Sequence, residues 1–149
     1  MKNLFDKKDL QELLHRIDQL NSLSVRKWGK MEAAQMLAHC ATPIEVALSK
    51  RTVPQGWLGK LFGGILKKFM LNQKPFRPNT PTDASLLITD TKLLEQEKQR
   101  IKTLLLLFHE NNGANIGSHL HPVFGRMTTD EWNIMTYKHL NHHLLQFSC

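Results

Sequence analysis

The chain has 149 residues, of which 41% are hydrophobic and 22% charged, a composition typical of a globular protein rather than a disordered one. No apolar run approaches the roughly 18–20 residues that a membrane-spanning helix requires. Residues 50–82 contain seven of the 20 lysines and arginines and no acid, while the other 13 balance the 13 acids. This distribution excludes a basic surface over the whole fold and argues against a nucleic-acid partner.

The first predicted element is a helix over residues 6–20, in which leucine and isoleucine recur at helical spacing. The N-terminal sequence is charged and periodic and lacks the apolar core of a signal peptide, so we expect a cytoplasmic protein. Its two cysteines, Cys40 and Cys149, are too few for a disulfide framework. We therefore expect reduced thiols, with Cys40 packed in the core.

The second predicted helix covers residues 30–48 and is rich in Ala, Met, Leu and Glu, which favour helix. His39 lies beside its apolar stripe. Pro43, four residues later, has no amide hydrogen to donate to the His39 carbonyl. We expect the helix to bend at this point.

A long segment, about residues 50–82, follows and ends in a proline-rich extended loop. Within it, GWLGKLFGGILKKFML places apolar residues at helical spacing with Lys60 and Lys67 on the opposite side, which indicates an amphipathic helix interrupted by Gly63 and Gly64. Our preferred interpretation is a short helix that caps the other helices or covers a pocket. The alternatives are a helix on a membrane surface and a contact within a homodimer.

Two further helices are predicted, over residues 89–111 and 129–147. The second of them begins with Thr128 and Glu131 at the spacing of a capping box. Strand patterns are almost absent, so we expect an all-α protein. The four helices predict a single domain over residues 1–149, an antiparallel four-helix bundle with the basic amphipathic segment inserted between its second and third helices.

The last predicted helix carries the histidines that point to a function. At about 100° per residue, His139 and His143 lie in the middle of the apolar side beside Trp132, and His142 lies at its margin. Residues i and i+4 are about 5–6 Å apart at Cβ, so two imidazole nitrogens can reach one ion. Imidazoles buried so closely require shared protonation, water or a metal. We favour a metal, with His39 as the third ligand.

The motifs MEAAQMLAHC, which contains His39, and HLNHHLLQ, which contains His139 and His143, together resemble the DinB/YfiT-like superfamily of metal-dependent four-helix bundles. The stretch HPVFGRMTTDEWNIMTYKHLNHHLLQF is similar to an uncharacterised domain-of-unknown-function branch of that group. The resemblance implies one divalent ion, commonly nickel, zinc or iron, held by these three histidines with open positions. Better-understood relatives transfer low-molecular-weight thiols or open small rings. They often carry His-Arg-Gly-Gln where this chain has His-Leu-Leu-Gln.

Four further residues are expected to border the pocket or to support the metal ligands: Gln35, Trp132, Gln146 and His121. The sequence thus predicts a divalent-metal-binding protein that acts as a metal-dependent enzyme of the thiol-transferase or hydrolase type on a small molecule such as a thiol. The competing hypothesis is a membrane-surface or protein-interaction module that uses residues 56–71, with the histidine site structural or empty.

Overall fold

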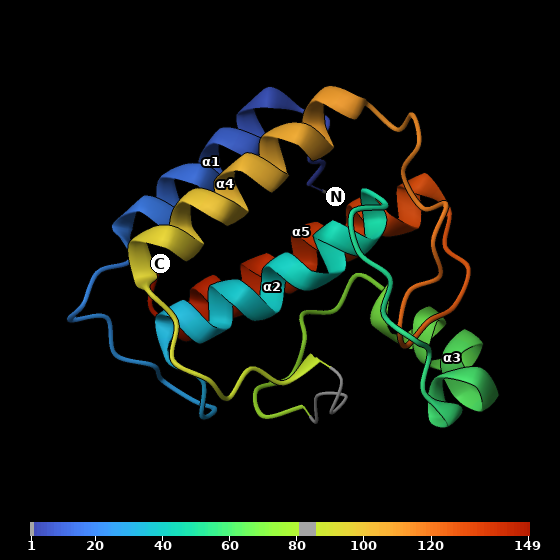
Figure 1. Cartoon of the computed structure of the whole chain (residues 1–149), viewed down its shortest axis with the longest axis horizontal. Coiled ribbons are helices and arrows are strands. Elements are labelled where there is room, and N and C mark those ends of the chain that lie inside the picture. Colours follow the sequence, from blue (N-terminus) through green and yellow to red (C-terminus); the bar gives the residue numbers. More distant parts are fainter. Residues whose placement is uncertain (1, 81–85) are drawn as a thin grey trace.

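The computed structural model describes residues 2–80 and 86–149, and in these ranges the chain is all-helical and contains no strand (Figure 1). The sole β-type pairing in the described ranges is an isolated bridge between His121 and Gly125. Five helices follow one another along the chain: α1 (Lys7–Gln19), α2 (Ala33–Ala47), α3 (Trp57–Met70), α4 (Leu94–Asn111) and α5 (Thr129–Gln146).

Four of the helices pack around one core. α2 contacts α4 and α5, and α1 contacts the same two helices (Figure 1). Apolar side chains from all four fill the space between them, among them Leu13, Leu37, Phe108 and Trp132, which are almost fully buried. This arrangement places α2 beside α5, the two helices that carry the candidate ligands.

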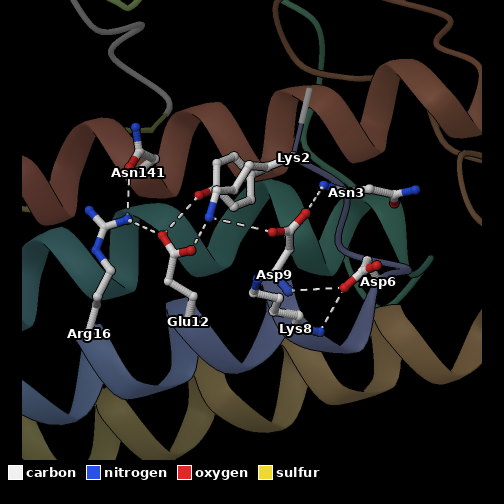
Figure 2. A network of polar contacts seen from close by, with 9 residues as sticks. Lys2, Asn3, Asp6, Lys8, Asp9, Glu12, Arg16 and Asn141 are labelled. Atoms are coloured by element: carbon white, nitrogen blue, oxygen red, sulfur yellow. Dashed lines mark hydrogen bonds and ion pairs between the residues drawn. The ribbon is translucent and has the colours of Figure 1, made fainter.

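A polar network joins the N-terminal segment and α1 to α5 (Figure 2). The Asp6 carboxylate caps α1 by accepting from two backbone amides. The amide of Asn133 donates to Asn3 Oδ1, and Arg16 donates to Asn141 Oδ1, both at 2.8 Å. These bonds tie α1 and the segment before it to α5, so that α5 is contacted by both α1 and α2.

Of the predicted helix boundaries, the start of α5 is confirmed and the start of α4 is wrong. At the start of α5, Thr128 and Glu131 form the predicted capping box. The start of α4 lies at Leu94 rather than at residue 89. The reason is tertiary: the carbonyl oxygens of Leu86 and Asp90 accept hydrogen bonds from side chains of α2, and this holds the backbone before α4 beside α2.

The interruption predicted for the amphipathic helix is wrong, because α3 continues through Gly63 and Gly64. A Cβ atom at Gly59 or Gly63 would lie 2.8 or 2.6 Å from the carbonyl oxygen of Val123. These glycines therefore let α3 approach the loop that precedes α5. Among the described residues, no helix is both long and apolar enough to cross a membrane.

Candidate metal centre

Three histidines from α2 and α5 meet in space. His39 lies in α2, and His139 and His143 lie on successive turns of α5. One nitrogen of each ring lies within 4.8 Å of the other two, and His39 Nε2 is 2.9 Å from His139 Nε2. The ring centroids are 4.8–5.0 Å apart. The structure thus brings together the three residues that the sequence singled out.

The three imidazoles are held neutral by their surroundings. His39 and His143 are buried, and His139 is partly buried. Burial lowers the pKa of His39, and burial with the nearby His39 ring lowers the pKa of His143 to about 3. Burial and the neighbouring imidazoles hold the pKa of His139 well below its usual value. Near neutral pH each ring therefore keeps one nitrogen lone pair, which is the form that binds a metal.

The tautomer of His39 is fixed by the backbone. Its Nδ1 lies 2.8 Å from the carbonyl oxygen of Leu86. A carbonyl only accepts hydrogen bonds, so Nδ1 carries the proton and donates it. The lone pair of His39 is therefore on Nε2, the atom that faces His139. Two lone pairs do not face each other at 2.9 Å, so a proton or a cation must lie between these two rings.

The tautomer of His143 is fixed through a second side chain. Gln146 Nε2 donates to the carbonyl oxygen of Trp28, and this orients the amide so that Oε1 accepts from His143 Nδ1 at 2.9 Å. The lone pair of His143 is therefore on Nε2. Gly29 makes this contact feasible, since a Cβ there would lie 2.6 Å from Gln146 Nε2. Gln146 thus supports a candidate ligand, as a supporting residue of a metal site would.

A pocket of about 420 Å³ opens beside the three histidines. Its volume lies within the roughly 300–1,000 Å³ typical of small-molecule sites. The polar residues in its wall are the three candidate ligands, His121, His142, Thr80 and Thr136. Most of the remaining wall is apolar and comes from several elements: Leu66 and Met70 of α3, Phe76, Val123, Phe124, Trp132 and Met135.

His121 contributes a hydrogen-bond donor of fixed tautomer to this pocket. Its Nδ1 accepts from the backbone amides of Val123 and Phe124 at 3.1 and 3.2 Å. The proton of the neutral ring is therefore on Nε2. Burial lowers the pKa of His121 to about 3, so the ring stays neutral near pH 7. His121 lines the pocket but is not one of the three clustered histidines.

Comparison with known families adds one result. Residues 2–148 match the family described as "Protein of unknown function (DUF1569)". The chain belongs to this family. No curated protein and no solved structure matches the chain significantly. The description of DUF1569 states no activity.

The other residues that the sequence singled out in this DUF1569 member lie in different surroundings. Trp132 is buried in the pocket wall, with its indole nitrogen packed against Gly117. Gln35 does not line the pocket, because its side chain bonds the backbone of Glu32 and Asp90. Cys40 is a core thiol as expected, and burial raises its pKa.

One residue of the pocket wall that no sequence pattern had indicated, Phe76, lies in the segment after α3. Phe76 lines the pocket and lies under the ammonium group of Lys138, 4.7 Å from the ring centroid. Lys138 also donates to the carbonyl oxygens of Met70 and Asn72, at the end of α3. Lys138 thus holds the segment that follows α3 against α5.

Proposed function

We propose that His39, His139 and His143 bind one divalent metal ion and that the protein is a metal-dependent enzyme acting on a small molecule. The observation that carries this proposal is the convergence of three nitrogens within 4.8 Å beside a pocket of about 420 Å³. Buried polar rings that converge in this way need a shared partner.

The residues present fit such an ion. The carbonyl of Leu86 and the Trp28–Gln146 pair fix the protons of His39 and His143 on Nδ1, so both rings carry their lone pair on Nε2, the form that can bind an ion. Such hydrogen bonds to the far nitrogen are typical of metal-binding histidines. Three neutral imidazoles suit zinc, nickel or iron. The described part of the chain contains one group of side chains that could hold a metal ion, and this group offers three protein ligands. We therefore expect a coordination position on the ion that is open to substrate.

When bound, the ion would act as a Lewis acid on a substrate carbonyl or thiol, which is the chemistry of a hydrolase or thiol transferase. The chain's own residues would bind and orient the substrate. The apolar wall would exclude water from its carbon skeleton, and the fixed Nε2–H of His121 would donate to an accepting oxygen or sulfur. This arrangement favours a small substrate with one apolar part and one polar group.

We also infer that the helices form a single-domain antiparallel four-helix bundle of the DinB/YfiT-like kind, with residues 50–82 as an insert. Two observations support this inference. Each of α1, α2, α4 and α5 contacts two of the other three. The candidate ligands lie in α2 and α5, the places that the resemblance implies. We propose a cytoplasmic location, because Cys40 and Cys149 are both free thiols, as is typical of proteins in a reducing compartment.

The first test is elemental analysis of the protein purified without an affinity tag. We expect about one divalent ion per chain, and its loss in His39→Ala, His139→Ala and His143→Ala. His142→Ala is the matched control, because His142 neighbours His143 but lies outside the cluster. Circular dichroism would show that each variant is folded. Absence of a stoichiometric ion, or equal loss in His142→Ala, would contradict the proposal.

A second test asks whether the site is open. Cobalt would be loaded in place of the native ion, and azide or a small thiol would be titrated in. A change in the visible spectrum is expected if an exogenous ligand reaches the ion. An unchanged spectrum would leave a structural ion and contradict the enzymatic part of the proposal.

A further inference from the structure

One face of α3 exposes an unusual amount of apolar surface. Trp57, Leu61, Ile65 and Phe69 follow one another at intervals of four residues and form a ridge. Their exposed fractions are 64–71%. Phe62 borders the same face and is 49% exposed. We call these five residues the α3 ridge.

The large side chains of the α3 ridge are mostly exposed, and among the described residues it is the opposite side that holds α3 to the rest of the fold. There Gly59 and Gly63 pack against the loop before α5, and Met70 is partly buried. Lys67 adds hydrogen bonds to the Glu131 carboxylate at 2.9 Å and to the Arg126 carbonyl at 3.0 Å. An amphipathic helix normally turns its apolar stripe inward. Here the stripe is turned outward, as expected of a surface that binds something else.

The charge around the ridge indicates what it binds. Lys60 and Lys68 are exposed on α3. The whole of residues 50–82 carries seven cations and no acid. An apolar ridge with basic flanks is complementary to a surface that offers both hydrocarbon and negative charge.

We propose that α3 docks on the surface of an anionic lipid membrane, with the α3 ridge at the boundary between headgroups and acyl chains. A helix of 14 residues is about 21 Å long, too short to cross the roughly 30 Å hydrocarbon core, so it lies in the plane of the interface. A second copy of the chain is the less favourable occupant. Pairing two ridges would bring together two segments that each carry seven cations and no acid.

The test uses the full chain and vesicles of phosphatidylcholine with or without phosphatidylserine. We expect sedimentation with the phosphatidylserine vesicles at physiological salt, weakening as salt is raised and weaker with phosphatidylcholine alone. No sedimentation of folded protein with either vesicle would overturn the proposal. So would sedimentation that is equal with both vesicles and insensitive to salt.

Matched variants locate the contact. The double variant Leu61→Ser/Ile65→Ser should weaken vesicle partitioning at least tenfold, while Leu23→Ser, at another exposed leucine, should leave it unchanged. Lys60→Gln and Lys68→Gln should each weaken partitioning about fivefold, from roughly 1 kcal/mol per cation near an anionic surface. Equal partitioning of the double variant and the parent would overturn the proposal.

Two readouts separate a membrane from a second copy. Vesicles should shift the tryptophan emission to the blue, and Trp57→Phe should abolish the shift while keeping most of the binding. Sedimentation equilibrium without lipid should show a monomer. A lipid-free dimer that Leu61→Ser/Ile65→Ser dissociates would show that another copy covers the ridge and would overturn the membrane proposal.

Discussion

α2 and α3 are both apolar helices of similar length, yet they stand in opposite relations to solvent. Thirteen of the 15 residues of α2 are buried, and its neighbours α4 and α5 cover it from two sides. In α3, by contrast, the large apolar side chains of the α3 ridge are exposed, and the two residues buried among those described are Gly59 and Gly63.

The difference shows that the apolar content of a helix does not decide what the helix is for. α2 has almost no polar side, so it can only lie in a core, and the one imidazole that it carries there must find polar partners. α3 has lysines and glycines among its apolar residues, and close packing by the glycines leaves the large side chains on the outside. The burial of α2 places His39 in the candidate metal site, whereas the packing of α3 leaves the α3 ridge exposed on the surface.

The largest expected effect contrasts one leucine from each helix. Leu37→Ala in α2 removes a fully buried side chain and should lower the free energy of unfolding by about 2–5 kcal/mol. Leu61→Ala in α3 removes a side chain that is 68% exposed and should change it by less than about 0.5 kcal/mol. Urea denaturation measures both. Comparable losses would mean that the α3 ridge is packed in solution.

The next effect tests why α3 faces as it does. Gly63→Ala would place a Cβ 2.6 Å from the Val123 carbonyl, whereas a Cβ at Gly64 would meet nothing within 4 Å. We expect Gly63→Ala to cost about 1–3 kcal/mol of local stability, because the helix must move away. Gly64→Ala should instead stabilise α3 by up to about 1 kcal/mol through helix propensity. Hydrogen exchange of the α3 amides would distinguish the two variants. Equal protection in both would contradict the close packing of Gly63 on the Val123 carbonyl.

Periodicity in the sequence was enough to place His139 and His143 on one side of a helix. It also indicated an amphipathic helix within residues 56–71 and a capping box at Thr128. These are local features, since each depends on residues within about two turns of one another. His39 could be added because few other histidines lie within a core helix.

Contacts with backbone far away in the chain could not be predicted. Gln146 was expected to support the ligands or border the pocket, but its hydrogen bond to the carbonyl of Trp28, 118 residues away, orients it toward His143 and could not be read from the sequence. The predicted start of α4 was wrong because the backbone before α4 accepts hydrogen bonds from side chains of α2. The Gly63–Gly64 pair was interpreted as an interruption because its partner, the Val123 carbonyl, is brought there by tertiary packing.

A smaller effect concerns the loop on which α3 packs, and it depends on pH. Burial lowers the pKa of His121 to about 3, below the roughly 6.5 of the unfolded chain. Below pH 6.5 the His121 ring therefore binds a proton in the unfolded state but not in the folded state. The free energy of unfolding consequently falls as the pH falls. The loss from this residue is about 1.4 kcal/mol at pH 5.5 relative to pH 7.5.

His121→Asn isolates this contribution, because Asn Oδ1 can still accept from the amides of Val123 and Phe124 but does not titrate. Denaturation at the two pH values should show a loss on acidification that is smaller by about 1.4 kcal/mol in the variant than in the parent. The other histidines are common to both proteins and cancel. An identical pH dependence would mean that His121 titrates in the folded state as it does in the unfolded state, and would contradict the lowered pKa.

The smallest expected effect compares two adjacent lysines of α3. Lys67 contacts Glu131 at 2.9 Å with both side chains about three-quarters buried, whereas Lys68 is exposed on the side of the ridge. A double-mutant cycle of Lys67→Met with Glu131→Gln should give a coupling of about 0.5–1 kcal/mol. Glutamine keeps the capping geometry at residue 131, so the cycle reports the ion pair rather than the helix cap. The same cycle with Lys68→Met should give a coupling near zero. If Lys68 coupled to Glu131 as strongly as Lys67 does, α3 would be rotated about its axis, and the ridge would no longer face outward.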